Sequence, residues 1–134
     1  MIFDSNIVLA MMDEIAGSPI IKLLERHRAG REVFINEIIF AEISPRFRDA
    51  DLVTEVCDVF GLEIKPLTLA ECHCAGQAFA EYRKRGGERR SILSDFLIGA
   101  QAEIRGWPLI TRDRKGFASY FPDLEIIDPF EGIK

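Results

Sequence analysis

Short apolar runs separated by longer segments of helical pattern constrain the fold of this chain more than any other feature. Five such runs predict strands, near residues 1–3, 32–35, 62–65, 107–110 and 124–127. The segments between them predict helices, near 7–13, 19–29, 37–44, 49–60, 69–84, 94–105 and 115–120. Strands that alternate with helices are typical of α/β proteins with parallel strands. We therefore expect an α/β fold with a mostly parallel central sheet of about five strands, flanked by helices.

The length and apolar content predict one domain that spans residues 1–134. The chain has 134 residues, of which 48% are hydrophobic, enough for one core and too few for two. The only internal flexible break, Gly86-Gly87, is too short to divide domains. Helix starts are predicted at Ser18-Pro19, Asn36 and Thr68, and helix ends at Gly30, Gly61 and Gly106.

Four acidic residues stand at the ends of predicted elements, where a parallel sheet binds its ligands. Asp4 closes the first apolar run, and Asp113 follows the fourth. Glu42 lies in the helix after the second run, and Asp95 opens the helix before the fourth. Ligands of an open α/β sheet bind beyond the carboxyl ends of the strands, so all four can meet at one edge. Crowded carboxylates raise one another's pKa unless a cation compensates, which predicts a site for a divalent ion.

Three of these acids also have ordinary structural explanations. Asp4 could accept backbone N–H bonds in a turn, and Asp113 could belong to a plain polar turn. Glu42 could pair with an arginine at the rim of its helix. It shares a helix face with apolar residues, however, whereas Glu37 lies roughly 140° away around the helix. Glu42 is therefore the better candidate of the two.

Asp95 lies in the first turn of its predicted helix, where Ser91 or Ser94 can act as the N-cap. The helix dipole favours an acid there without any function. The residues that follow are apolar on nearly all sides, so we expect a buried helix whose tip opens into a pocket. Gly99, one turn on, costs about 1 kcal/mol against Ala in a helix interior, which predicts the close approach of a neighbouring backbone.

The charge distribution partly offsets an unfavourable total for binding nucleic acid. The formal net charge is −5, whereas affinity for nucleic acids comes mainly from Lys and Arg. Basic residues nevertheless gather between positions 83 and 90, and again around Asp113 at Arg112, Arg114 and Lys115. A solvated basic loop is as good an interpretation of the first group as phosphate contact, when that segment is taken alone.

The cysteines and histidines do not predict a site of their own. Three cysteines are an odd number in a chain of this size, which favours reduced thiols. Side chains of Cys72-His73-Cys74 would diverge by about 100° per residue on a helix, so we expect them to pack there and not to bind metal. His27 lies in a charged stretch and is expected at the surface. With no leader and no long apolar run, we expect a cytoplasmic protein without a membrane partner.

Taken together, these segments resemble the PIN domain and, within that family, the VapC-type toxins. The likeness rests on Asp4-Ser5-Asn6, Glu42, the segment 94–100 and Leu109-Ile110-Thr111-Arg112-Asp113. It continues into the tail, through Phe121-Pro122. Each motif is weak alone, but four in this order and spacing are specific.

The resemblance implies a Mg²⁺- or Mn²⁺-dependent endoribonuclease, a toxin that pairs with a cognate antitoxin and forms a homodimer. On that scheme Asp4, Asp95 and Asp113 bind the ion directly or through water, and Glu42 helps to hold the ion and to orient the attacking water. Asn6 and Thr111 would orient the carboxylates. The residues expected to hold RNA phosphates are Arg85, Arg89, Arg90, Arg112 and Arg114. Oxygen ligands suit a hard ion, and water activated by a metal needs no histidine base.

The sequence departs from the family pattern in one segment, and it leaves two alternative functions open. Asp113 is followed by Arg114, Lys115 and Gly116, so a further acid that the family sometimes has just beyond this position is absent, and the number of metal ions, one or two, stays open. The other functions are a catalytically silent PIN-like module that binds RNA or protein, and a metal-dependent, phosphatase-like hydrolase. A candidate dimer surface comprises Leu52, Val53, Val56, Val59 and Phe60, although a stripe of this kind is more often core.

Overall fold

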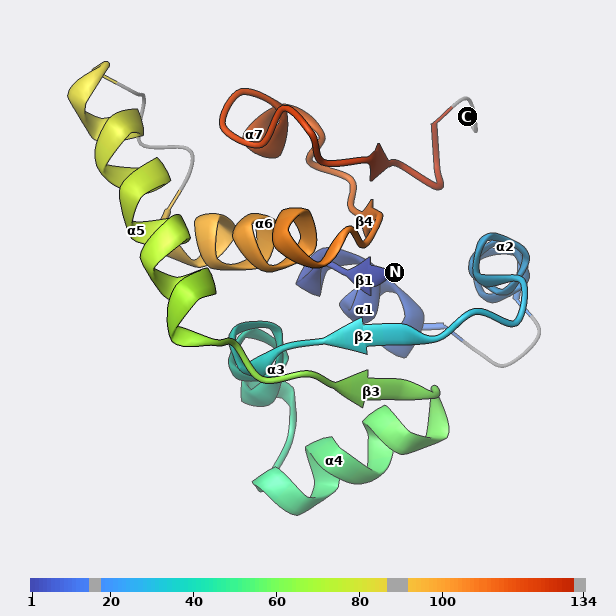
Figure 1. Ribbon diagram of the computed structural model, residues 1–134. Coiled ribbons are helices and arrows are strands. Elements are labelled where there is room, and N and C mark those ends of the chain that lie inside the picture. The colour runs from blue at the N-terminus through green and yellow to red at the C-terminus, as the bar shows by residue number, and fades with distance from the viewer. Residues whose placement is uncertain (15–17, 87–91, 132–134) are drawn as a thin grey trace.

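The computed structural model describes residues 1–14, 18–86 and 92–131, and its five strands form one sheet (Figure 1). The strands are β1 (Ile2–Phe3), β2 (Val33–Ile35), β3 (Leu62–Ile64), β4 (Leu109–Ile110) and β5 (Ile126–Ile127). Their order is β3-β2-β1-β4-β5, and every neighbouring pair is parallel. Each predicted run contains one strand, so the predicted α/β fold with a parallel sheet is confirmed.

The strand order reverses at the centre of the sheet. Ile2 of β1 pairs with Phe34 on one side and with Leu109 on the other. The chain adds β2 and β3 on the first side, then returns to add β4 and β5 on the second. Ligands of α/β sheets bind where the order reverses, beyond the carboxyl ends of the two diverging strands. Asp4 and Thr111 directly follow these two strands, β1 and β4.

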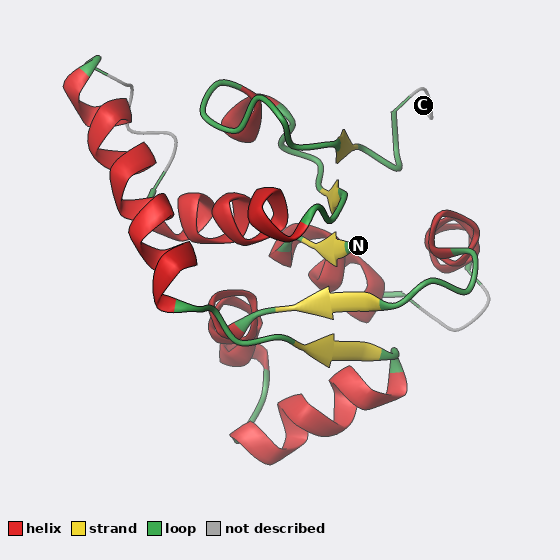
Figure 2. Cartoon of the chain, viewed as in Figure 1, coloured by secondary structure: helices red, strands yellow, loops and turns green. Residues whose placement is uncertain are grey.

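Helices connect the strands throughout the described residues (Figure 2). They are α1 (Ser5–Met12), α2 (Pro19–Arg28), α3 (Glu37–Ile43), the 3-10 helix η1 (Ser44–Arg46), α4 (Ala50–Val59), α5 (Leu69–Lys84), α6 (Leu93–Arg105) and α7 (Lys115–Ala118). None of them is both long and apolar enough to cross a bilayer. The helix α1 begins two residues before its predicted start, because the Asp4 side chain accepts the N–H of Ser5 and caps the helix there.

Three helix starts and the end of α6 follow the predicted signals. Ser18, Asn36 and Thr68 cap α2, α3 and α5 through their side-chain oxygens. At the end of α6, Gly106 has φ of 67°, the left-handed conformation in which glycine is the favoured residue. This stop directs the chain into β4, so the start and the end of α6 lie at opposite edges of the sheet.

Gly99 in α6 has a packing explanation, although not the predicted one. A Cβ atom at this position would lie 2.5 Å from Cε2 of Phe121. The neighbour that requires glycine is therefore an aromatic ring and not a backbone. Phe121 is only 2% exposed and packs against Phe96 with ring centroids 5.9 Å apart. This contact fastens the segment after α7 onto α6, next to the helix turn that carries Asp95.

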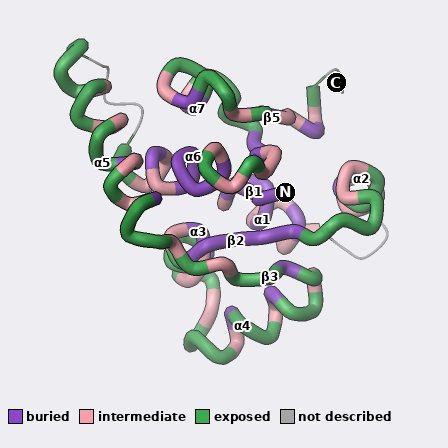
Figure 3. Tube along the Cα trace, in the orientation of Figure 1, coloured by how far each residue is buried: buried purple, intermediate pink, exposed green. Residues whose placement is uncertain are grey.

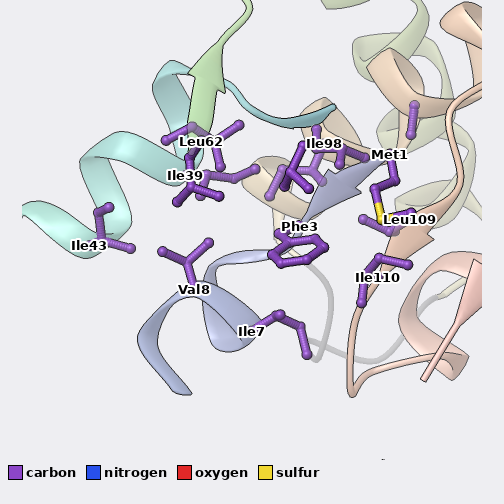
Figure 4. Close-up of a cluster of buried hydrophobic side chains, with 14 of the residues drawn as sticks. Met1, Phe3, Ile7, Val8, Ile39, Ile43, Leu62, Ile98, Leu109 and Ile110 are labelled. Carbon is purple, nitrogen blue, oxygen red and sulfur yellow. The ribbon is translucent and has the colours of Figure 1, made fainter. Parts of the chain in front are cut away.

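The core fills the space between the sheet and the surrounding helices. Figure 3 shows buried residues concentrated along β1, β2 and α6, whereas α4 and the last turns of α5 are mostly exposed. Side chains from β1, α1, α3 and β4 meet around Phe3 (Figure 4). Val53 on α4 belongs to this core with 1% exposure, so its place in the candidate dimer surface was wrong. Val59 on the same helix is 82% exposed.

Candidate active site

Asp4 lies between β1 and α1 and is the most deeply buried of the four predicted acids, with 5% exposure. Its Oδ1 accepts the N–H of Ser5 at 2.8 Å. Its Oδ2 accepts the hydroxyl of Thr111 at 2.8 Å and the side-chain amide of Asn6 at 3.0 Å. Three donors thus hold one carboxylate at the switch between β1 and β4.

Thr111 and Asn6 connect the two diverging strands. The Thr111 hydroxyl donates to Asp4 and accepts from Asn6 Nδ2 at 3.4 Å and from the N–H of Asp113 at 3.0 Å. Thr111 is fully buried, and Asn6 Oδ1 also accepts the N–H of Arg112 at 3.4 Å. Thr111 and Asn6 therefore hold the Asp4 carboxylate and the backbone of the loop that carries Asp113.

Asp95 sits in the first turn of α6, as predicted, but the predicted serine cap is wrong. The N-cap residue is Ile92, and its N–H donates to Asp95 Oδ2 at 3.2 Å. Asp95 therefore takes the third helical position, from which its carboxylate reaches back to the N-cap residue. Ser91 lies outside the described residues, and the hydroxyl of Ser94 is buried with no hydrogen-bond partner among those described.

Asp113 follows β4 in the loop that leads to α7. Its N–H is held by Thr111, and its Oδ1 accepts the N–H of Gly116 at 3.3 Å. The residue is exposed. The same hydrogen-bond pattern thus occurs at Asp4, Asp95 and Asp113: each carboxylate accepts a backbone N–H at the start of a helix.

Glu42 lies near the end of α3 and is exposed as a whole residue. Glu37 at the start of the same helix points elsewhere, because its Oε1 accepts the N–H of Leu67 at 2.8 Å. In Figure 1 the arrowheads of β2 and β3 point towards the side of the molecule where α3 and the start of α6 lie. The choice of Glu42 over Glu37 as a site candidate agrees with this placement.

The four carboxylates form one electrostatic group. Burial raises the pKa of Asp4, and the charge of Asp113 raises it further, against hydrogen bonds from Thr111 and Ser5. Burial raises the pKa of Asp95, and so do the charges of Asp4 and Asp113. The pKa of Glu42 is raised by removal of its carboxyl group from water and by the charges of Asp4 and Asp95. Through these charge interactions each of the four predicted acids is coupled to at least one of the others.

The chemistry of this group fits a hard cation. All the side-chain atoms of this group that could ligate a metal are carboxylate oxygens. A cation would remove the repulsion that raises the pKa values of these carboxyl groups. Among the described residues, no three acids, histidines or cysteines converge closely enough to ligate one ion directly. Mg²⁺ commonly keeps several waters and takes only one or two carboxylates directly, so the set fits an ion held partly through water.

The predicted phosphate-binding arginines already have partners within the chain. The guanidinium of Arg112 lies 3.9 Å from the ring centroid of Phe130. Arg114 pairs with Glu131 at 3.0 Å, and Arg85 pairs with Glu81 at 2.9 Å. These residues are exposed, so a phosphate could exchange for either acid at low cost. Arg89 and Arg90 lie outside the described residues.

The structure also contains a buried polar network that sequence reasoning missed. Asn36 donates to Gln101 Oε1 at 2.9 Å, and Gln101 donates to the carbonyl of Lys65 at 2.9 Å. Glu71, with 1% exposure, accepts from Arg105 Nε at 2.7 Å. The only signal of Glu71 in the sequence is the spacing Thr68-x-x-Glu71, which forms a capping box at the start of α5.

The three cysteines lie on α4 and α5. Cys57 is buried in the core, and all three thiols are free. The ring of His73 lies 3.2 Å from Nε2 of Gln77 on the exposed side of α5, while Cys72 and Cys74 on either side are partly buried. Within the part of the chain that is described, these residues form no metal group.

Comparisons with known proteins agree with the fold. The family model described as PIN domain matches residues 1–120. The chain belongs to the PIN-domain family. Ribonuclease VapC42 of Mycobacterium tuberculosis H37Rv is 29% identical to this PIN domain over 118 residues, which cover 84% of this chain and 89% of the relative. The resemblance stated from the sequence is confirmed.

Solved structures share the fold of this PIN domain from end to end. DNA-bound VapBC from Salmonella typhimurium superposes with a TM-score of 0.72 at 20% identity, and the match covers 96% of both chains. VapBC-1 from nontypeable Haemophilus influenzae gives a TM-score of 0.70 at 20% identity, over 98% of this chain and 100% of the other. At this level of identity the likeness concerns the fold.

Proposed function

We propose that this PIN domain is a VapC-type endoribonuclease, a toxin that hydrolyses RNA phosphodiester bonds with the help of Mg²⁺ or Mn²⁺. The observation that carries the proposal is the group of four carboxylates at the switch between β1 and β4, in which three raised pKa values mark uncompensated negative charge. Membership of the PIN-domain family and the similarity to a VapC ribonuclease support it.

Each acid has a distinct role in the proposed reaction. Asp4, Asp95 and Asp113 hold the ion directly or through water, and Glu42 orients the attacking water and takes up its proton. A bound divalent ion supplies Lewis-acid stabilisation of the phosphate and lowers the pKa of water. Thr111 and Asn6 keep Asp4 in place. Neither histidine takes part, since His27 lies on α2 and His73 on α5, bonded to Gln77.

Basic residues around the site would bind the RNA backbone. Arg112 and Arg114 flank Asp113 and are exposed, so they can exchange Phe130 and Glu131 for phosphate. Arg85 ends α5 near the segment that contains Arg89 and Arg90, and we propose the same role for all three. Because each such contact releases counterions, RNA binding should weaken steeply with salt.

A cognate antitoxin and a second copy of the chain are the proposed partners, and a cytoplasmic location stays a prediction. The antitoxin is supported by the VapBC complexes that share the fold. For the dimer we propose the exposed part of α4, where Val59 is 82% exposed. Val59→Arg should then convert a dimer to a monomer in light scattering. Leu69→Arg, at an equally exposed apolar residue on α5, should leave the dimer intact.

Cleavage of RNA by the purified chain tests the proposed activity. A mixture of structured RNAs is incubated with Mg²⁺, with Mn²⁺ and with EDTA, beside the variants Asp95→Asn and Asp123→Asn. Asp123 is exposed and precedes β5, at the other edge of the sheet, so it is the matched control. Cleavage should need the metal, disappear in Asp95→Asn and persist in Asp123→Asn.

Other outcomes would point to the alternatives. Metal-independent cleavage, or cleavage that survives in Asp95→Asn, would contradict the proposed site. Binding of RNA without cleavage would favour a catalytically silent module. Hydrolysis of mononucleotides in preference to RNA would favour a phosphatase-like hydrolase.

A further inference from the structure

Gly116 makes an unusually close contact with the carboxylate of Asp113. A Cβ atom at position 116 would lie 2.7 Å from Oδ2 of Asp113, 3.2 Å from its Cγ and 3.4 Å from its Oδ1. The backbone N–H of Gly116 donates to Oδ1 of the same carboxylate at 3.3 Å. The carboxylate thus occupies the space that a side chain at position 116 would enter, and it accepts a hydrogen bond from the Gly116 amide.

Neither backbone conformation nor helix propensity explains glycine at this position. Gly116 lies outside the left-handed region, unlike Gly30, Gly61, Gly86 and Gly106. It is the second residue of α7, where Ala is favoured over Gly by about 1 kcal/mol. The contact with Asp113 is the feature of the structure that a side chain at position 116 would disturb.

Any side chain at 116 would move the Asp113 carboxylate before it moved anything else. The Asp113 backbone is tied to the buried hydroxyl of Thr111 through its N–H, and Thr111 is itself tied to Asp4. The carboxylate is the free end of a short side chain in an exposed loop. The steric clash with a Cβ at position 116 would therefore be relieved by rotation or displacement of that carboxylate, while the loop backbone stays in place.

We propose that Gly116 is a positioning residue that sets where the Asp113 carboxylate points, and thereby how well the site holds its ion. This inference rests on the proposed function, in which Asp113 helps to bind the metal. A larger residue at position 116 would push the Asp113 carboxylate of this chain away from the position that its own loop defines.

Calorimetric titration of the RNA-free protein with Mn²⁺ tests the inference without a measurement of activity. Gly116→Ala should weaken Mn²⁺ binding roughly 10-fold, the lower end of the range for changes to groups that orient metal ligands. Gly76→Ala is the matched control, because Gly76 also lies in a helix and a Cβ there would meet nothing within 4 Å. It should bind Mn²⁺ like the wild type.

A double-mutant cycle assigns the effect to Asp113. In an Asp113→Ala background the carboxylate is gone, so Gly116→Ala should no longer change the Mn²⁺ affinity. Gly116→Ser carries the same Cβ with a lower helix propensity, and it should weaken binding as Gly116→Ala does. Thermal unfolding in EDTA shows that each variant is folded.

Three results would overturn the inference, and they can be told apart. Wild-type affinity in Gly116→Ala, with weakened binding in Asp113→Ala, would refute the role of Gly116 and leave the proposed function standing. Equal effects of Gly116→Ala with and without Asp113 would show that the glycine acts through another group. No Mn²⁺ binding by the wild type would refute the metal site of the proposed function itself.

Discussion

The carboxylates at the two ends of α6 have opposite surroundings: one is paired with a cation, and the other lies among further carboxylates. At the end of the helix, Arg105 donates to the buried carboxylate of Glu71 at 2.7 and 3.1 Å. Burial alone would raise the pKa of Glu71, but hydrogen bonds from Arg105 and Thr68 outweigh it and lower the pKa. At its start, Asp95 faces other carboxylates, and burial and their charges raise its pKa.

This difference separates a pair that stabilises the fold from the group of acids for which we propose a function. Glu71 and Arg105 satisfy each other, and their hydrogen bonds join α5 to α6. The carboxylates around Asp95 repel one another, which costs stability in the absence of a cation. Proteins keep such groups where a ligand or a reaction uses the charge. The two ends of one helix therefore make opposite predictions for substitutions of similar size.

The largest expected effect is at the end of α6. Arg105→Met leaves the Glu71 carboxylate buried without its partner, and the free energy of unfolding should fall by about 3–5 kcal/mol. Arg85→Met is the control, because it breaks the exposed pair with Glu81 and should cost about 0–1 kcal/mol. Urea unfolding measures both. Equal losses would mean that burial of Glu71 does not matter.

At the start of α6 a substitution should raise the free energy of unfolding instead of lowering it. Asp95→Asn removes one of the repelling charges, while the amide oxygen can still accept the N–H of Ile92. In EDTA at neutral pH the variant should be more stable than the wild type, by about 0.5–2 kcal/mol. Glu71→Gln should lose stability under the same conditions. A destabilised Asp95→Asn would contradict the idea that the acids repel.

The pH dependence of stability should follow from the same contrast. A carboxyl group with a raised folded pKa adds stability below its unfolded pKa, and that stability is lost as the pH rises through the folded pKa. Asp4, Asp95 and Glu42 are of this kind, above ordinary values of 3.8 for Asp and 4.5 for Glu. In EDTA, stability should therefore increase as the pH falls from 7 towards these values.

Two controls sharpen the pH prediction. Asp95→Asn should reduce the gain in stability at lower pH. Saturating Mg²⁺ should abolish this gain, because the ion and protons compete for the same carboxylates. Glu71 contributes the opposite dependence, but its lowered pKa confines that loss to pH values below 4.5. Urea midpoints between pH 7 and 5 give the slope. A flat or falling curve in EDTA would contradict the raised pKa values.

The smallest effect on stability is expected at Arg114. Its pair with Glu131 is exposed on both sides, so Arg114→Gln should change the free energy of unfolding by less than about 1 kcal/mol. RNA binding should nevertheless weaken, with the slope of log K against log salt reduced by about 0.7. Arg31→Gln, before β2 at the other edge, should leave the slope unchanged. Fluorescence anisotropy with an uncleaved RNA in EDTA measures both.

Local patterns predicted the elements and the acids because these depend on neighbours in sequence. Strand runs, caps and glycine stops act within a few residues, and the crevice rule then assigns Asp4, Asp95 and Asp113 to one edge. The pair of Glu71 and Arg105 was missed because its partners are 34 residues apart. Glu71 shows in the sequence only as a capping residue, and nothing local indicates that Arg105 reaches it.

The partners of the arginines near Asp113 were missed for the same reason. Arg112 meets Phe130 and Arg114 meets Glu131 only because β5 lies beside β4. Gly99 was recognised as a place of close approach, but its partner, the ring of Phe121, depends on how the chain folds back after α7. The helix pattern predicts contact faces, and the tertiary fold decides which residues fill them.

Broadening of amide signals by Mn²⁺ tests the central claim most directly, because it locates the ion without assuming a reaction. A second group of acids, Glu103, Asp123 and Glu125, lines a small cavity at the end of α6 and gives the ion another place to bind. With substoichiometric Mn²⁺, the nitrogen–proton NMR signals of Ser5, Asp95 and Gly116 should disappear first, while those of Glu103 and Asp123 persist. Loss of the Glu103 and Asp123 signals first would contradict the assignment of the ion to the switch between β1 and β4.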